Sequence, residues 1–206
     1  MNGGCIPWHV TMRLEFNQFY CENLTMSSKD MADIAGFTVM HGDTSGGLER
    51  YLKESASKDE LLGTMRTYIV RMKETDECVG YFSLKAGLVS LRESQLEDDV
   101  IFDTVPGVEL ANYAVNGQYM RKYHAKGIGG VIFIHFIIPV IRMAADLIGV
   151  CLVYLFALPQ PALLEHYRTY GFQRLSSDAE RKLHRRLKPL YDQSCIFMFY
   201  PLCMNI

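Results

Sequence analysis

The stretch HAKGIGGVIF, residues 124–133, has three glycines within four positions and then continues into a long apolar run. Glycine loses more backbone entropy on folding than other residues and brings no side chain to a core. Its use here indicates a turn with unusual backbone angles, or a backbone that a ligand approaches closely. A strand-like segment, VELANYAVN (residues 108–116), precedes it. A strand, a glycine turn and a helix N-terminus together form an anion site, because N–H groups and the helix dipole attract negative charge.

The glycines complete neither of two common phosphate-binding motifs. The pattern G-x-x-x-x-G-K-[ST] is absent. The pattern G-x-G-x-x-G matches only at Gly127 and Gly129, because its third position is Ile132. A helix that begins with glycines only for close packing therefore remains an alternative.

The composition is that of an ordinary globular chain with a cytoplasmic location. Of its 206 residues, 49% are hydrophobic and 21% charged, and the net charge is −2. Because nucleic-acid binders are usually basic, any RNA contact must depend on local patches. The six cysteines show no C-x-x-C spacing, which predicts reduced thiols and no metal site. The N-terminus lacks the basic and apolar segments of a signal peptide.

The apolar run at residues 127–158 predicts a buried helix followed by a buried strand, and no membrane contact. It contains His135, Pro139, Arg142 and Asp146, so no uncharged window of about 18 residues is present. Pro139 removes a helix hydrogen bond and clashes with the preceding turn. We expect a kink or a break near residues 136–139, and two short helices are the alternative.

Periodicity and turn residues divide the rest of the chain into strands and helices. Residues 42–47, 75–80 and 92–107 are predicted as loops or turns, and the basic residues 181–189 as a surface segment. No internal repeat or linker interrupts the order, so residues 1–206 are predicted to form one α/β domain. Strands are predicted at 8–16, 64–74, 80–91, 108–116, 149–158 and 194–202, and helices at 27–37, 48–63, from 127 onward and at 161–171.

Two motifs in this order resemble the GNAT superfamily of N-acetyltransferases. Its signature of Gln or Arg, two residues, Gly, one residue, then Gly or Ala is matched by residues 124–129, with His124 in the first place. Its Phe-Tyr-x-x-x-Gly-Phe motif corresponds to HYRTYGF, residues 166–172. The resemblance covers residues 66–202. It implies a single GNAT-like domain with a central mixed, mostly antiparallel sheet, a parallel pair of strands that splay apart, and flanking helices.

The resemblance also implies acetyl-CoA as the acyl donor. Its pyrophosphate would contact the backbone amides of Lys126, Gly127, Ile128, Gly129 and Gly130, with charge added by Arg121, His124 or Lys126. Its pantetheine arm would pair with Tyr113, Ala114 and Val115 as an added strand. Two departures from the family pattern concern the long link between Val115 and Gly127 and the replacement of a common Asn, for which Gln160 is the nearest candidate.

For the chemistry, the resemblance implies direct attack of a primary amine on the thioester in a ternary complex. Tyr167 is the candidate general acid for the leaving thiolate, with a core aromatic as the alternative and Tyr170 as a competitor. A backbone N–H of the Ala114–Val115 strand would hold the oxyanion. Glu109 is a candidate base acting through water, and a salt-bridged or solvent-facing carboxylate is its alternative.

The N-terminal half is similar to the bacterial GNAT-type toxins of toxin–antitoxin pairs. The segment PGVELANYAV (residues 106–115) is similar to their Pro-x-x-x-Leu-x-x-x-Ala-Val strand. The other positions that match are Leu48, Tyr51, Leu52, Ala56, Thr67 and Tyr68. This resemblance implies the α-amine of an aminoacyl-tRNA as acceptor and an antitoxin as partner.

Other acceptors and roles stay open at the level of sequence. A small-molecule or protein amine is the broader interpretation, and a catalytically inactive CoA-binding module is a further alternative. Whether the chain forms a homodimer is also open. The basic residues dense enough to contact tRNA are Arg121, Lys122, Lys126, Arg181, Lys182, Arg185, Arg186 and Lys188.

Overall fold

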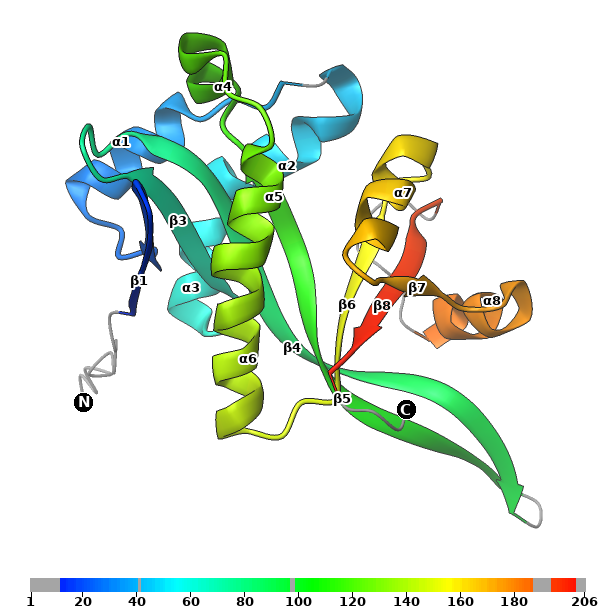
Figure 1. Cartoon of the computed structure of the whole chain (residues 1–206). Helices are drawn as coiled ribbons and strands as arrows, with labels where there is room; N and C mark the ends of the chain where they lie inside the picture. Colours follow the sequence, from blue (N-terminus) through cyan, green and yellow to red (C-terminus); the bar gives the residue numbers. More distant parts are fainter. Residues whose placement is uncertain (1–11, 41, 97–98, 187–193, 203–206) are drawn as a thin grey trace, which may run out of the picture. The chain divides into compact units, whose positions relative to one another are not determined.

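A computed structural model describes residues 12–40, 42–96, 99–186 and 194–202. Its eight strands form one mixed sheet in the hydrogen-bonded order β1-β2-β3-β4-β5-β6-β8-β7 (Figure 1). One pair, β5 with β6, is parallel. The predicted fold class, a mixed α/β sheet with one parallel pair and flanking helices, is confirmed. The chain forms two compact units, Met1–Phe82 with Ala114–Phe136, and Ser83–Tyr113 with Ile137–Ile206.

In the first unit, three short strands pair antiparallel beside the start of β4. Strand β1 (Arg13–Phe16) pairs with β2 (Phe19–Asn23), and β2 pairs with β3 (Arg66–Met72). Strand β2 was not predicted, and residues 8–11 of the first predicted strand lie outside the described residues. Helices α1 (Ser28–Gly36), α2 (Gly42–Glu54) and α3 (Ala56–Leu62) belong to the same unit. Its core is built around Leu24, Ile34, Phe37, Leu52, Ile69 and Tyr81.

The helix boundaries in this unit follow local capping rules. Ser27 accepts a hydrogen bond from the backbone N–H of Asp30, so α1 begins where its cap predicts. The predicted loop at 42–47 is wrong, because these residues form the first turns of α2, where glycine and short polar residues are tolerated. The predicted helix at 48–63 is broken at Ser55, and Gly63, with φ of +69°, ends α3.

A buried arginine connects α1 to strands β2 and β3. The side chain of Arg71 has no exposed surface and forms ion pairs with Asp30 at 2.5 Å, Asp33 at 2.8 Å and Glu22 at 2.8 Å. Burial alone would raise the pKa of Asp30. Hydrogen bonds from Thr25 and Arg71 outweigh burial and hold that pKa below its ordinary value. The cluster therefore joins three elements through charges that have few other partners.

Strands β4 (Cys78–Leu96) and β5 (Asp99–Val115) run through both units and are longer than the sequence predicts. The predicted loop at 92–107 is wrong, because most of it continues these two strands as a hairpin that projects from the second unit (Figure 1). Backbone pairing alone satisfies the N–H and C=O groups of such a hairpin, so it needs no apolar face. The segment was therefore predicted as a loop from its acidic composition, although most of it is strand.

The second unit continues the sheet from β5. Strand β6 (Leu152–Ala157) pairs antiparallel with β8 (Ile196–Pro201), which also pairs with β7 (Gln173–Arg174). Helix α7 (Pro161–Thr169) ends before Gly171 as predicted, and α8 (Ser177–Arg186) contains most of the predicted basic segment. The core of this unit is formed by Val89, Leu152, Tyr154, Leu183 and Phe197.

The long apolar helix continues past Pro139 without a break. It comprises α5 (Ile128–Ile132), a π-helical segment (Phe133–Ile137) and α6 (Ile138–Leu147), in which proline occupies the first turn. Proline is tolerated at a first turn, and the wider π segment accommodates it, so the expected irregularity takes this form. By length and composition the helix could cross a membrane, with 39% of the tested window buried. A core helix of a soluble protein passes the same test, so this is weak evidence for a membrane span.

We predict that Arg71→Leu lowers the free energy of unfolding by about 3–5 kcal/mol at pH 7, because it leaves Asp30 buried without its cation. The folded-state pKa of Asp30 is depressed, so its contribution is present above an unfolded pKa of about 3.9 and is lost as pH falls through the folded value. The difference between the two proteins should therefore shrink below about pH 4.

Chemical denaturation at pH 7 and pH 3 measures both effects. Lys53→Ala is the control, since it removes a half-exposed i,i+4 pair with Glu49 and should cost no more than about 0.5 kcal/mol. An Arg71→Leu protein as stable as this control would contradict the prediction.

Candidate functional site

The glycine turn lies between two helices of the first unit. The long link that the sequence left without structure contains α4 (Gly117–Tyr123), capped by the side chain of Asn116 and ended by His124 at φ of +48°. Gly127, at φ of +72°, is the N-cap of α5, and nothing within 4 Å surrounds the position of a Cβ there. The left-handed backbone therefore explains this glycine without any packing constraint.

Of the three basic side chains expected to add charge at the phosphate, Arg121 already has a partner, and so does the neighbouring Lys122. Arg121 donates to Thr38 at 3.4 Å, and Lys122 pairs with Glu77. His124 and Lys126 are exposed, and neither side chain forms a hydrogen bond or ion pair within the described part of the chain. The turn thus presents a helix start and two uncommitted basic groups on one short segment.

Packing holds the turn close to strands β4 and β5. A Cβ at Gly80 of β4 would lie 2.8 Å from the carbonyl oxygen of Ala114 and 2.8 Å from Ile132 of α5. The backbone N–H of Asn116 donates to the carbonyl of Val79, so β5 stays paired to its end. Gly80 therefore allows the apolar helix to approach the strand that carries Ala114 and Val115.

Strands β5 and β6 part after only a short parallel pairing. The register runs from Gly107 opposite Leu152 to Glu109 opposite Tyr154 and stops there. Strand β5 nevertheless continues to Val115, and β6 continues to Ala157. We call the region beyond Glu109 and Tyr154 the notch. The parallel strands thus splay as the resemblance implied, and the β5 edge can accept an extended ligand as an added strand.

Three tyrosines of the second unit are electrostatically coupled at the notch. Burial raises the pKa of Tyr113 well above its ordinary value, and Tyr167 and Tyr170 raise it further. Burial also raises the pKa of Tyr167 to about 12, with a smaller contribution from Tyr170. Tyr167 lies at the end of α7 and packs edge-on against Phe172 at 5.6 Å between ring centres. Its hydroxyl therefore keeps its proton at neutral pH.

Glu109 is buried at the last residue pair before the strands part. The hydroxyl of Tyr154 donates to its carboxylate at 3.3 Å. Burial raises the pKa of Glu109, while Lys85 and Tyr154 oppose the rise. A Cβ at Gly87 would overlap the Tyr154 hydroxyl, and one at Gly107 would lie 3.2 Å from its ring. Glu109 is therefore not solvent-facing, and it forms no salt bridge with any residue that the structure describes.

The remaining predicted residues lie at the starts of α7 and α5. Gln160 is the exposed N-cap residue of α7, with its backbone N–H donating to the carbonyl of Leu158 at 2.7 Å. Ile128 is buried, whereas Gly129 and Gly130 are half-buried. No cluster of three or more His, Cys, Asp or Glu able to hold a metal occurs among the residues that are described.

The sequence did not indicate the part played by Tyr154, although a signal for it existed. Glycine within a strand marks close approach of another group, and Gly87 and Gly107 both lie against this one side chain. Asn112, a polar residue in an otherwise apolar and aromatic strand segment, was also passed over.

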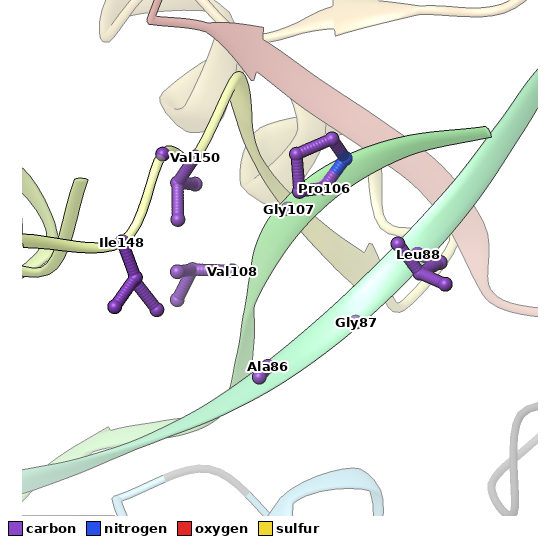
Figure 2. A pocket seen from close by; sticks show the side chains of 9 residues that line it. Ala86, Gly87, Leu88, Pro106, Gly107, Val108, Ile148 and Val150 are labelled. Carbon is purple, nitrogen blue, oxygen red and sulfur yellow. The ribbon is translucent and has the colours of Figure 1, made fainter.

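An apolar pocket of about 370 Å³ lies in the second unit near the other end of the β5–β6 pairing. Figure 2 shows the side chains of Val108, Ile148 and Val150 gathered on one side of it, with Leu88 on β4. It contains none of the titratable residues predicted for the site. The chemistry therefore has to be sought at the notch and the glycine turn.

No protein-family profile matches the sequence, but solved structures are similar over most of both chains. A mutant of the toxin AtaT, bound to the C-terminus of the antitoxin AtaR and acetyl-CoA, has a TM-score of 0.60 at 19% identity and covers 90% of this chain and 94% of that one. A mutant of KacT gives 0.61 at 18%, with 90% and 95% covered. AtaT complexed with acetyl-methionyl-tRNAfMet gives 0.61 at 17%, with 89% and 94% covered.

AtaT and KacT are GNAT-type toxins. The chain has their fold. The resemblance seen in the sequence is therefore confirmed at the level of the GNAT fold. At these identities, activity has to be argued from the residues of the chain itself.

We predict that Gly171→Ala destabilises the protein more than Gly127→Ala. Gly171 has φ of +90°, and an added Cβ would lie 3.0 Å from the ring of Tyr200. Gly127→Ala meets only the left-handed backbone, which costs about 1–2 kcal/mol, whereas Gly171→Ala adds a clash and should cost about 2–4 kcal/mol. Denaturant unfolding of the two variants checks this order, and equal values would contradict the packing at the end of α7.

Proposed function

We propose that this chain is an acetyltransferase that moves the acetyl group of acetyl-CoA to a primary amine. The observation that carries the proposal is the notch, where two parallel strands part beside the coupled tyrosines Tyr113, Tyr167 and Tyr170. A strand edge that has parted from its neighbour and a buried proton donor fit an amide-bearing acyl donor. Structures similar in fold include one bound to acetyl-CoA.

The acyl donor would extend from the glycine turn along β5. Its pyrophosphate would accept hydrogen bonds from backbone amides at residues 126–130, with added charge from His124 and Lys126. Its pantetheine arm would pair with the backbone of Tyr113, Ala114 and Val115, which follow one another on β5. Arg121 and Gln160 would have secondary parts, since Arg121 already has a partner and Gln160 is exposed.

Acetyl transfer forms a nitrogen–carbon bond and breaks the carbon–sulfur bond of the thioester. The amine attacks as the neutral species, and a backbone N–H of the Ala114–Val115 strand stabilises the oxyanion. The sulfur leaves as a thiolate and takes the proton of Tyr167. The buried phenol of Tyr167, with a pKa of about 12, holds its proton until the thiolate forms. The same burial makes the thiolate more basic, so the thiolate can take that proton.

Glu109 is the proposed acceptor of the amine proton through a water molecule. It is buried at the base of the notch, and its raised pKa makes it a stronger base than an ordinary carboxylate. The hydrogen bond from Tyr154 keeps its carboxylate oriented.

For the acceptor, we propose the α-amine of an aminoacyl-tRNA, with the chain acting as a toxin held in check by an antitoxin. AtaT has been solved with acetyl-methionyl-tRNAfMet and with the C-terminus of AtaR. Two basic segments of this chain suit phosphate contacts. One contains the exposed Lys126 beside the turn, and the other is α8, where Arg181 and Lys182 are exposed while Leu183 is buried. A small-molecule or protein amine is the alternative acceptor.

We predict that Gly129→Glu and Tyr167→Phe separate donor binding from chemistry. Gly129→Glu adds bulk and negative charge where the pyrophosphate would lie, so calorimetry should detect no acetyl-CoA binding. Tyr167→Phe removes only the proton, so acetyl-CoA affinity should stay within a few-fold while turnover falls by about 10²–10⁴.

Gly36→Glu is the matched control for the added carboxylate, because Gly36 is exposed and has nothing within 4 Å of an added Cβ. It should bind acetyl-CoA as the natural chain does. Unchanged acetyl-CoA affinity in a folded Gly129→Glu protein would move the donor away from the turn. Full turnover in Tyr167→Phe would return that tyrosine to a packing role.

A further inference from the structure

The amide nitrogen of Asn112 is a buried donor without a hydrogen-bond acceptor among the described residues. This residue lies on β5 with 4% of its surface exposed. Leaving such a donor unsatisfied costs about 1–3 kcal/mol. Natural folds retain few such groups, and each one calls for a specific explanation.

A second asparagine on the same segment shows the ordinary arrangement. Asn116 is also buried, and both ends of its amide are used. Its Oδ1 accepts from the backbone N–H of Gln118 at 3.0 Å, and its Nδ2 donates to the carbonyl of Cys78 at 2.9 Å. Four residues separate a fully satisfied asparagine from one whose donor is left over, so burial alone does not explain Asn112.

Asn112 lies inside the notch. It is three residues beyond Glu109, the last residue of β5 that pairs with β6. Continued in the same register, it would face Ala157, the small last residue of β6. Asn112 is adjacent in sequence to Tyr113, and alternation along the strand gives it the face of Leu110 and Ala114. The unpartnered donor is therefore directly before Tyr113 to Val115, the strand segment that the proposed function assigns to the acyl donor.

The chemistry of the group limits what it can bind. Nδ2 is a donor, so its partner must be an acceptor oxygen. In the proposed arrangement it is the pantetheine arm, and not the pyrophosphate, that pairs with β5 directly after Asn112. At this depth the acyl donor carries only its pantetheine amides and its thioester, whose acceptors are carbonyl oxygens.

We propose that Asn112 is a binding residue for the acyl donor, and that its Nδ2 group donates a hydrogen bond to a carbonyl oxygen of the pantetheine–thioester arm. This inference rests on the proposed function. The bond satisfies the buried amide only in the complex. It also fixes the rotation of the arm about its long axis, which backbone pairing with β5 leaves less restricted.

The test is Asn112→Leu, which keeps a similar volume and removes the polar group. Loss of one hydrogen bond should weaken acetyl-CoA binding by about tenfold in calorimetry. The melting temperature of the ligand-free protein should stay the same or rise, because the unsatisfied donor is gone. Asn116→Leu is the matched control, and its melting temperature should fall because two backbone groups lose their partner. Asn112→Ala repeats the affinity measurement if the leucine variant does not fold.

Titration with CoA as well as acetyl-CoA identifies the carbonyl. If it belongs to the thioester, Asn112→Leu weakens only acetyl-CoA; if it belongs to a pantetheine amide, both ligands bind more weakly. Unchanged affinity for both ligands would overturn the inference, as would a fall in melting temperature as large as that of Asn116→Leu. A natural chain that binds neither ligand would overturn the proposed function as well, which separates the two failures.

Discussion

The parting of β5 and β6 after the Glu109–Tyr154 pair is the constraint on which the site depends. Parallel strands that stayed paired to their ends would have no edge at Asn112 and Tyr113. At this last pair, the ring of Tyr154 lies against Gly107 and its hydroxyl against Gly87, and the same hydroxyl donates to the buried carboxylate of Glu109. Beyond this pair, the proposed function assigns the edge of β5 and the hydroxyl of Tyr167 to the acyl donor.

Each unit also contains a polar group whose burial demands compensation. In the first unit, Arg71 receives it within the fold, from carboxylates on α1 and β2. In the second unit, the amide donor of Asn112 has no hydrogen-bond partner among the residues that the structure describes, and neither does Nε2 of His184. Of these two groups, only Asn112 lies on the strand that the proposed function assigns to the acyl donor. An unsatisfied amide at a strand edge is better explained by a ligand than by poor packing.

Much of the architecture was predictable from the sequence because it follows from local signals. Ser27 as a cap, Gly63 and Gly171 as helix ends, and the glycine turn at Gly127 all depend on backbone preferences that a sequence displays. The GNAT fold followed from two motifs in order. The hairpin at 92–107 was missed because its pairing uses the backbone, not an apolar pattern. The start of helix α2 was predicted as a loop because the glycines and short polar residues at 42–47 are also common in loops.

For the site, the sequence predicted residues with suitable chemistry, such as Tyr167, Glu109 and Lys126, and their roles stay predictions. It could not indicate which polar groups end up satisfied, since that depends on contacts across strands. In the sequence, Tyr154 is one of several aromatic residues in a buried strand, and only the structure shows that Gly87 and Gly107 lie against it. The account as a whole is tested most directly by incubating the purified chain with labelled acetyl-CoA and a set of aminoacyl-tRNAs, and analysing the nuclease-released aminoacyl-adenosines by mass spectrometry. The account predicts an acetyl group on the α-amine of at least one of them, together with release of CoA. The absence of both acetylation and CoA release, with these acceptors and also with a panel of small amines and peptides, would contradict the account.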